Sequence, residues 1–194
     1  DLVAEVSAVL AFSATKNNDR VGLLLFTDDV ERIVPPRKGA RHVMRVVAET
    51  LQFQPKGHGT DLGRALDTLG HLARRRAVTF VVSDFLGDDY EHSLRVAAAR
   101  HDLVPVTVTD PREDELVDVG IAWCEDLETG ELVPVDTSSA RVREAYRQRV
   151  TQQKVARDTL FKRLAIDHIA LQTHRPYITP LAEFFRRRAR RMHG

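Results

Sequence analysis

The fold of this chain is decided by the stretch Val78-Thr79-Phe80-Val81-Val82-Ser83-Asp84. Its first five residues are apolar or β-branched without alternation, which is typical of a parallel strand covered by helices on both faces. The apolar run stops at Ser83, and Asp84 follows directly. An acid at the carboxyl end of such a strand lies where open α/β sheets bind their ligands. The stretch therefore predicts a buried strand that presents Asp84 at a ligand-binding edge.

A second stretch, Gly57-His58-Gly59-Thr60-Asp61-Leu62, leads into a helical pattern of apolar residues. Thr60 stands where that helix should begin, so its hydroxyl is free to cap the helix or to face the crevice that holds Asp84. One hydroxyl and one carboxylate make half of a site for Mg²⁺, which takes oxygen ligands and keeps several waters. The two stretches together predict the core of a hard-cation site.

Outward from these stretches, strands and helices alternate along the chain. We expect helices over residues 1–16, 41–51, 61–75, 88–100, 139–164 and 179–192, and strands over 21–26, 30–34, 78–82, 103–108, 121–125, 131–135 and 166–173. Strand 30–34 should be an antiparallel edge strand that stops before Pro35 and Pro36, which cannot donate to a ladder. The alternation predicts an α/β fold with a doubly wound, mostly parallel sheet.

Length and composition limit the class of protein. The 194 residues fit one domain over 1–194, with the long helix, last strand and arginine-rich helix as a C-terminal extension. The 29 basic and 28 acidic residues nearly cancel, which argues against a general polyanion-binding role. The single cysteine, Cys124, indicates a reducing compartment and is expected to be packed inside its strand. No apolar run reaches the roughly 20 residues of a membrane span, so a cytoplasmic location is expected, with an upstream anchor left open.

The first residues, Asp1-Leu2-Val3-Ala4-Glu5-Val6, already read as a helix with an apolar stripe. An α/β chain usually begins with a strand. We therefore expect the native protein to extend upstream of Asp1.

Five short motifs occur in order along the chain: Gly59-Thr60-Asp61-Leu62, Ser83-Asp84-Phe85-Leu86, Asp110-Pro111-Arg112-Glu113, Asp126-Leu127-Glu128-Thr129-Gly130 and the arginine-rich closing helix. With Asp19-Arg20-Val21-Gly22-Leu23, they resemble a bacterial family of unknown function. Its members carry a von Willebrand factor A-like domain and are commonly encoded beside MoxR-type AAA ATPases. The resemblance covers essentially the whole chain.

This resemblance implies a metal-ion-dependent adhesion site built from three loops. The first loop of such a site supplies Asp-x-Ser-x-Ser, the second a threonine and the third an aspartate. Thr60 matches the second loop and Asp84 the third. The first motif would lie upstream of Asp1 on the central strand, so the resemblance implies that the sheet of this chain lacks its first, central strand. The expected cation is Mg²⁺ or Mn²⁺, held incompletely by these residues alone, and the expected partner is a protein, with a MoxR-type ATPase as the candidate.

Several neighbouring residues have two interpretations. Gly59, Asp61, Ser83 and Asp110 are candidates for the second shell of the cation or for partner contact. For Asp61 and Ser83 a turn or cap role is equally plausible, and Asp110 fits better as the start of the turn before Pro111. The acids around Gly130 do not match a calcium loop, and the eight histidines show no metal-ligand spacing.

The closing helix carries the strongest charge run of the chain, formed by Arg186, Arg187, Arg188, Arg190 and Arg191. Cations are favoured at the C-terminal end of a helix, which explains the run without a ligand. A patch for an anionic partner is the alternative. Nucleic acid is not expected, because the net charge is near zero and no aromatic residues are interleaved with these arginines.

Two function classes compete for the predicted site. The leading one is a binding module, not an enzyme, that engages a partner carboxylate through the cation. The rival is a Mg²⁺-dependent phosphoryl-transfer or phosphatase-like enzyme, which would use acids such as Asp84, Asp88 and Asp89 with a nucleophilic aspartate on the absent first strand. Reading the upstream residues separates the two, since Asp-x-Ser-x-Ser supports adhesion and Asp-x-Asp supports phosphoryl chemistry.

Overall fold

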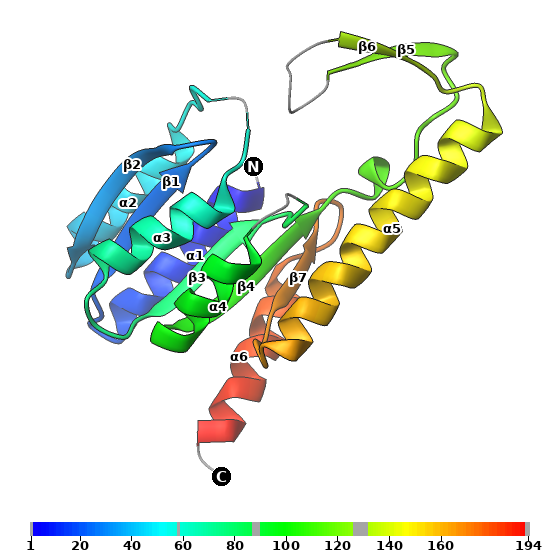
Figure 1. Ribbon diagram of the computed structural model, residues 1–194. Helices are drawn as coiled ribbons and strands as arrows, with labels where there is room; N and C mark the ends of the chain where they lie inside the picture. Colours follow the sequence, from blue (N-terminus) through cyan, green and yellow to red (C-terminus); the bar gives the residue numbers. More distant parts are fainter. Residues whose placement is uncertain (1, 58, 87–89, 126–131, 193–194) are drawn as a thin grey trace. The chain divides into compact units, whose positions relative to one another are not determined.

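A computed structural model describes residues 2–57, 59–86, 90–125 and 132–192 of the chain (Figure 1). The chain forms two compact units. The first comprises Asp1–Arg76 and Gly87–Arg100, and the second comprises Ala77–Leu86 and His101–Gly194. Each unit is described below by itself.

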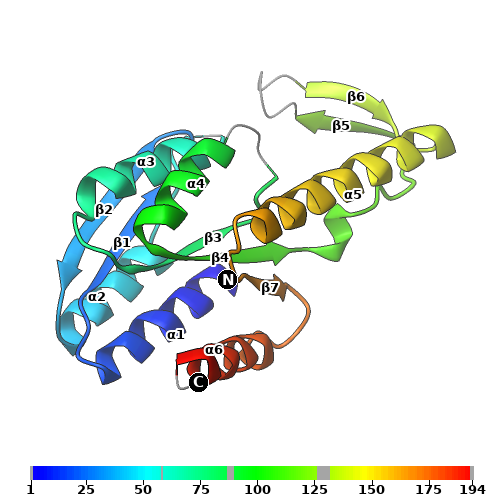
Figure 2. The same ribbon diagram turned by 60° about the horizontal axis from the view of Figure 1, so that its bottom comes forward.

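The first unit is a two-stranded antiparallel sheet enclosed by helices. In chain order its elements are α1 (Leu2–Lys16), β1 (Val21–Phe26), β2 (Val30–Arg37), α2 (Ala40–Leu51), α3 (Leu62–Leu72) and α4 (Glu91–Arg100). Figures 1 and 2 show α3 on one face of the β1–β2 sheet and α1 and α2 on the other. On the α1 and α2 side, the core is built from Ala11, Val34, Val43 and Val46.

Two predictions for this unit need correction. Strand β2 does not stop before Pro35 but continues to Arg37, which pairs with Val21. It can do so because the β1–β2 register shifts between Val21 and Leu23, so that Pro35 and Pro36 lie at an irregularity where neither is paired with a residue of β1. Helix α3 ends at Leu72 rather than near residue 75, with Ala73 as its C-cap.

The second unit is built on a parallel sheet with strand order β3–β4–β7. Its elements are β3 (Val78–Ser83), β4 (Asp102–Thr109), η1 (Pro111–Glu113), β5 (Ile121–Glu125), β6 (Leu132–Asp136), α5 (Ala140–Arg163), β7 (Ile169–Gln172) and α6 (Ile178–Met192). Figure 2 shows α5 and α6 on opposite sides of β7. The molecule is thus mixed α/β, as the alternation of strands and helices predicted. Its parallel sheet has three strands among the described residues.

Burial in this sheet differs from the expectation for β3. Five consecutive residues of the central strand β4 are buried, from Leu103 to Thr107. In β3 only Val81 is buried, and Val78 is 58% exposed. The reason is position in the sheet, because β3 is an edge strand that pairs with β4 alone among the described strands. Strand β7 is also shorter than the predicted 166–173, since Ala165 and Ile166 complete the C-terminal cap of α5.

Strands β5 and β6 form the predicted antiparallel hairpin. Trp123 lies opposite Pro134 and is 66% exposed. Cys124 is half-buried, so the expectation of a fully packed thiol is wrong. A two-stranded hairpin has few neighbours with which to cover either face. The acids predicted at its turn (Asp126, Glu128 and Glu131) lie outside the described residues, as do Asp88 and Asp89.

Of the described helices, none combines the length and the apolarity that crossing a bilayer requires.

Candidate functional site

The loop that carries Thr60 is held in place by Glu31, a residue of β2. The Glu31 Oε1 atom accepts hydrogen bonds from the backbone N–H of Lys56 at 2.9 Å and of Gly57 at 3.1 Å. It also accepts one from the Thr27 hydroxyl at 2.8 Å. The Lys56 N–H, the Thr27 hydroxyl and the Gly57 N–H together hold the pKa of Glu31 below its usual value. Glu31 therefore ties the start of this loop to the end of β1, a role that no sequence pattern predicted.

The backbone approaches very closely at Gly57. A Cβ at this position would lie 1.7 Å from Asp28 Oδ1 and 2.4 Å from Thr27 Oγ1. Both distances are too short for any side chain, so only glycine fits while these two side chains keep their places. A Cβ at Gly59 would lie 3.5 Å from Asp28 Cβ, which is an ordinary van der Waals contact. Between these two glycines, His58 lies outside the described residues.

The helix cap after this loop is Asp61 and not Thr60. The Asp61 carboxylate accepts a hydrogen bond from the Arg64 N–H at 2.8 Å, and the Asp61 N–H donates to the Thr27 carbonyl at 2.7 Å. The interpretation of Thr60 as the cap of α3 is therefore wrong. Thr60 is exposed, and no hydrogen bond among the described residues engages its hydroxyl. Of the two expected roles for Asp61, the structure shows the cap.

The residues that follow β3 form a tight turn in the second unit. The Ser83 hydroxyl accepts a hydrogen bond from the Phe85 N–H at 3.1 Å, and Asp84 Oδ1 accepts one from the Leu86 N–H at 3.2 Å. The Ser83 hydroxyl also lies 3.4 Å from Asp84 Oδ1. Asp84 is exposed, and its Oδ2 atom takes no part in the hydrogen bonds of the described residues. Ser83 and Asp84 Oδ1 thus shape the turn, and Asp84 Oδ2 makes no hydrogen bond within the part of the chain that the structure describes.

Asp110 occupies the equivalent place after the neighbouring strand β4. Its carboxylate accepts a hydrogen bond from the Arg112 N–H at 2.9 Å and caps the short helix η1. The Arg112 N–H, the Thr173 hydroxyl and the nearby charges of Arg112 and His174 hold the pKa of Asp110 below its usual value. The predicted turn before Pro111 is therefore present, and it engages the carboxylate that was considered for the second shell.

These residues belong to two groups. Ser83, Asp84 and Asp110 lie at the carboxyl ends of adjacent parallel strands, while Gly59, Thr60 and Asp61 belong to the first unit. Within the described part of the chain, no group of three or more histidine, cysteine, aspartate or glutamate side chains is arranged to hold a metal ion. Oxygen atoms from Thr60 and Asp84 suit a hard cation in kind, but they are too few to fill its shell.

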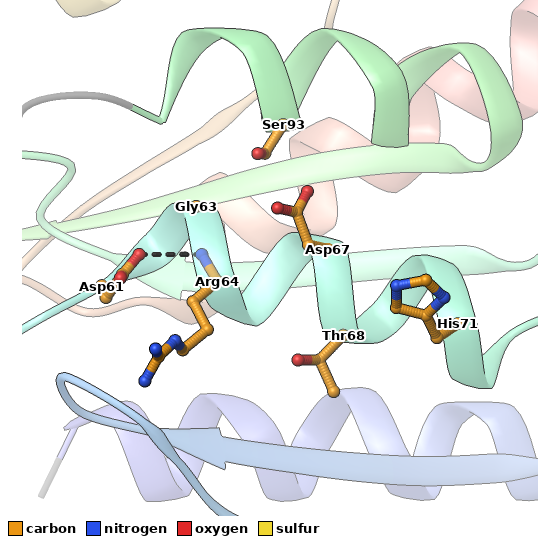
Figure 3. A pocket seen from close by; sticks show the side chains of 7 residues that line it. All are labelled: Asp61, Gly63, Arg64, Asp67, Thr68, His71 and Ser93. Atoms are coloured by element: carbon orange, nitrogen blue, oxygen red, sulfur yellow. Dashed lines mark hydrogen bonds between the residues drawn. The ribbon is translucent and has the colours of Figure 1, made fainter.

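An open groove of about 470 Å³ runs between α3 and α4 of the first unit (Figure 3). Polar side chains line it, and Asp67 points from α3 toward Ser93 of α4. The Asp61 cap bond to Arg64 lies at one end of the groove. The groove is open, and apart from Gly63 its lining residues are polar, so it lacks the hydrophobic and aromatic lining typical of a small-molecule pocket.

The arginine run on α6 is partly engaged within the protein. Arg188 forms an ion pair with Asp102, and its guanidinium carbon lies 5.6 Å from the centre of the Phe184 ring. Arg191 forms an ion pair with Asp167. Arg186 donates to the Ala182 carbonyl at 3.3 Å. Arg187 and Arg190 remain exposed, so the surface available to an anionic partner is smaller than the sequence suggests.

With its parallel three-stranded sheet and enclosing helices, the protein is of the mixed α/β class. Residues 1–156 match the family described as "Protein of unknown function DUF58", and the chain belongs to that family.

Two curated relatives are mycobacterial. The uncharacterized protein Rv1480 of Mycobacterium tuberculosis (strain ATCC 25618 / H37Rv) is 36% identical over 134 residues, covering 67% of this chain and 42% of the relative. The uncharacterized protein MAV169 of Mycobacterium avium is 30% identical over 161 residues, covering 81% of this chain and 94% of the relative. The chain thus spans less than half the length of the first of these relatives.

One solved structure shares the fold. The crystal structure of the conserved hypothetical protein BatB from Bacteroides thetaiotaomicron superposes with a TM-score of 0.51 at 15% sequence identity. The match covers 92% of this chain and 83% of that chain. At this identity the likeness concerns the fold alone.

Proposed function

We propose that this protein is an interaction module that captures a protein partner through a divalent cation, Mg²⁺ or Mn²⁺, with Thr60 and Asp84 among the cation's ligands. One observation carries the proposal. Asp61, and not Thr60, caps α3, and Asp84 uses only its Oδ1 atom in the turn after β3, where that atom accepts a hydrogen bond from the Leu86 N–H. Thr60 and Asp84 are both exposed, and neither the Thr60 hydroxyl nor the Asp84 Oδ2 atom makes a hydrogen bond among the described residues.

The chemistry of these two groups fits adhesion. A neutral hydroxyl and a single carboxylate leave a divalent cation short of ligands and charge. A carboxylate from a partner completes the shell, and the contact then depends on the cation. Such binding needs neither a general base nor a nucleophile, and we propose that the protein is not an enzyme.

The finer fold assignment belongs to the same proposal. A von Willebrand factor A-like arrangement is supported by the parallel order β3–β4–β7, with Asp84 and Asp110 at strand ends, and by the motifs that resemble that family. From the same resemblance we propose a MoxR-type AAA ATPase as the partner, in complex assembly or maturation. A cytoplasmic setting for the module is part of the proposal.

The alternative is Mg²⁺-dependent phosphoryl transfer that uses Asp84 with an aspartate outside this sequence. The two proposals differ in turnover. A phosphatase-like enzyme releases phosphate from a phosphate monoester in a reaction that Asp84→Asn stops, whereas an adhesion module binds its partner and releases nothing.

The test is capture of a MoxR-type ATPase from the same organism by the full-length protein, in Mg²⁺ and again in chelator. Capture is expected in Mg²⁺ only, and Thr60→Ala or Asp84→Ala should abolish it. The matched control is Asp67→Ala, which removes an exposed carboxylate from α3. Capture that survives chelator, or that persists in both variants, would overturn the proposal.

A further inference from the structure

We infer that Arg157 of α5 is a positioning residue for Asp84, and that α5 thereby sets the cation affinity of the loop after β3. The inference rests on the proposed function for the role of Asp84. The positioning itself stands on contacts within the second unit.

Arg157 is a buried cation on α5, whose other buried residues, Val150, Leu160 and Phe161, are apolar. Its side chain is 7% exposed. Its Nη1 atom donates to the Asp84 backbone carbonyl at 3.1 Å, and its Nε atom donates to Asp158 Oδ1 at 3.0 Å. Burying a guanidinium costs free energy unless its donors are paired. The planar fork of arginine lets one side chain serve two acceptors at fixed geometry, which lysine cannot do.

A second contact from the same helix holds the next residue of the turn. Phe85 has a φ of +57°, a left-handed conformation that is rare for a bulky side chain. Its ring is buried and meets the Phe161 ring edge to face, with centroids 5.2 Å apart. Arg157 and Phe161 are four residues apart, so they lie on one face of α5. Strained conformations of this kind persist only where the surroundings hold them.

These two anchors flank the peptide bond between Asp84 and Phe85. With the carbonyl fixed by Arg157 and the ring fixed by Phe161, the turn directs the Leu86 N–H to Asp84 Oδ1. Releasing the carbonyl should let the left-handed turn relax and the Asp84 carboxylate reorient. The face of α5 that carries Arg157 thus controls the geometry of the proposed ligand.

The direction in which cation affinity changes when Arg157 is removed shows whether Arg157 acts by positioning Asp84 or only by its charge. Arg157 is a positive charge in direct contact with the Asp84 backbone. If only its charge mattered, removing it would strengthen binding of a cation at Asp84. If Arg157 positions the carboxylate, removing it weakens binding although a repulsive charge is lost.

The experiment compares the full chain with Arg157→Met, Arg157→Lys and the control Arg149→Met, which removes an exposed arginine from the same helix. Hydrogen exchange of the Phe85 and Leu86 amides reports the turn, and Mn²⁺ binding followed by water-proton relaxation reports the site. In Arg157→Met we expect exchange about tenfold faster at these amides, as for a locally opened segment. We expect Mn²⁺ affinity about tenfold lower, at the weak end for outer-shell partners of a metal site.

Arg157→Lys keeps the positive charge but loses the planar guanidinium, so it should show both effects to a smaller degree. It replaces Arg157→Met as the test if the Met variant does not fold. Unchanged exchange at Phe85 and Leu86, or Mn²⁺ binding that is equal or tighter in Arg157→Met, would overturn the inference. Faster exchange in a protein that binds no Mn²⁺ even as the wild type would uphold the positioning by Arg157 and refute the proposed function of Asp84.

Discussion

The close backbone approach at Gly57 makes a sharp prediction for Gly57→Ala. The new methyl group would lie 1.7 Å from Asp28 Oδ1 and 2.4 Å from Thr27 Oγ1. Asp28 is exposed and can swing away. Thr27 cannot, because it is buried and its hydroxyl donates to Glu31 at 2.8 Å. The loop must therefore move, and it takes with it the bonds from Lys56 and Gly57 to Glu31.

Forcing a methyl group into a well-packed site costs about 1–3 kcal/mol. In a chain of this size each kcal/mol lowers the melting temperature by about 2–4 °C. Gly57→Ala should therefore melt roughly 2–12 °C below the wild type. Gly59→Ala is the matched control, because its Cβ meets only Asp28 Cβ at 3.5 Å, and it should stay within about 0.5 kcal/mol of the wild type.

The assay is thermal and urea unfolding of the three proteins side by side, with the fold of each checked by circular dichroism. Equal midpoints for Gly57→Ala and Gly59→Ala would refute the reasoning. The same result would show that Thr27 and Glu31 do not fix the loop that leads to Thr60.

Three further predictions concern pH, the end of α5 and the arginine run. Because hydrogen bonds lower the pKa of Glu31, its contribution is present at neutral pH and lost as pH falls through that lowered pKa. The difference in melting temperature between the wild type and Glu31→Gln should thus be largest above pH 4.5 and should shrink as the pH falls further. A difference that does not depend on pH would contradict this. Ala165 belongs to the C-terminal cap of α5, with a φ of +53° and an N–H that donates to the Lys162 carbonyl. Glycine adopts this left-handed conformation without a Cβ penalty, so Ala165→Gly should raise the free energy of unfolding by about 0.5–1 kcal/mol in urea titration. A loss of stability would count against the cap. Arg188→Met should lower the melting temperature more than Arg190→Met, because Arg188 contacts both Asp102 and the Phe184 ring; equal losses would show that these contacts contribute nothing.

Much of the fold could be read from local patterns. The apolar run before Asp84, the helical spacing after Asp61 and the arginine-rich end each predicted the right element in nearly the right place. Burial of the strands was harder to predict. The residues of β3 and β4 look alike in sequence, but among the described strands only β4 is paired on both edges, and an apolar run does not reveal its neighbours.

The candidate site shows the same division. Thr60 and Asp84 could be proposed from the sequence because a helix start and a strand end are local signals. Glu31 was missed because its partners lie 25 and 26 residues away, and nothing in β2 marks it as different from its exposed neighbours. Arg157 was missed because it is one arginine among several on α5, and only the structure shows that it is buried against Asp84. Long-range partners of this kind leave no trace in periodicity.

If Thr60 and Asp84 bind a divalent cation, the melting temperature of the full-length protein depends on that cation. A ligand that binds only the folded state at 100 times its dissociation constant adds about 2.7 kcal/mol of stability. With about 2–4 °C per kcal/mol, the account predicts a rise of roughly 5–11 °C in Mg²⁺ or Mn²⁺ over chelator. Thr60→Ala and Asp84→Ala should each remove that rise. In chelator, Thr60→Ala should melt with the wild type and Asp84→Ala somewhat below it, because Asp84→Ala also loses the hydrogen bond from the Leu86 N–H. A melting temperature that does not respond to either cation, or a rise that both variants retain, would contradict the claim.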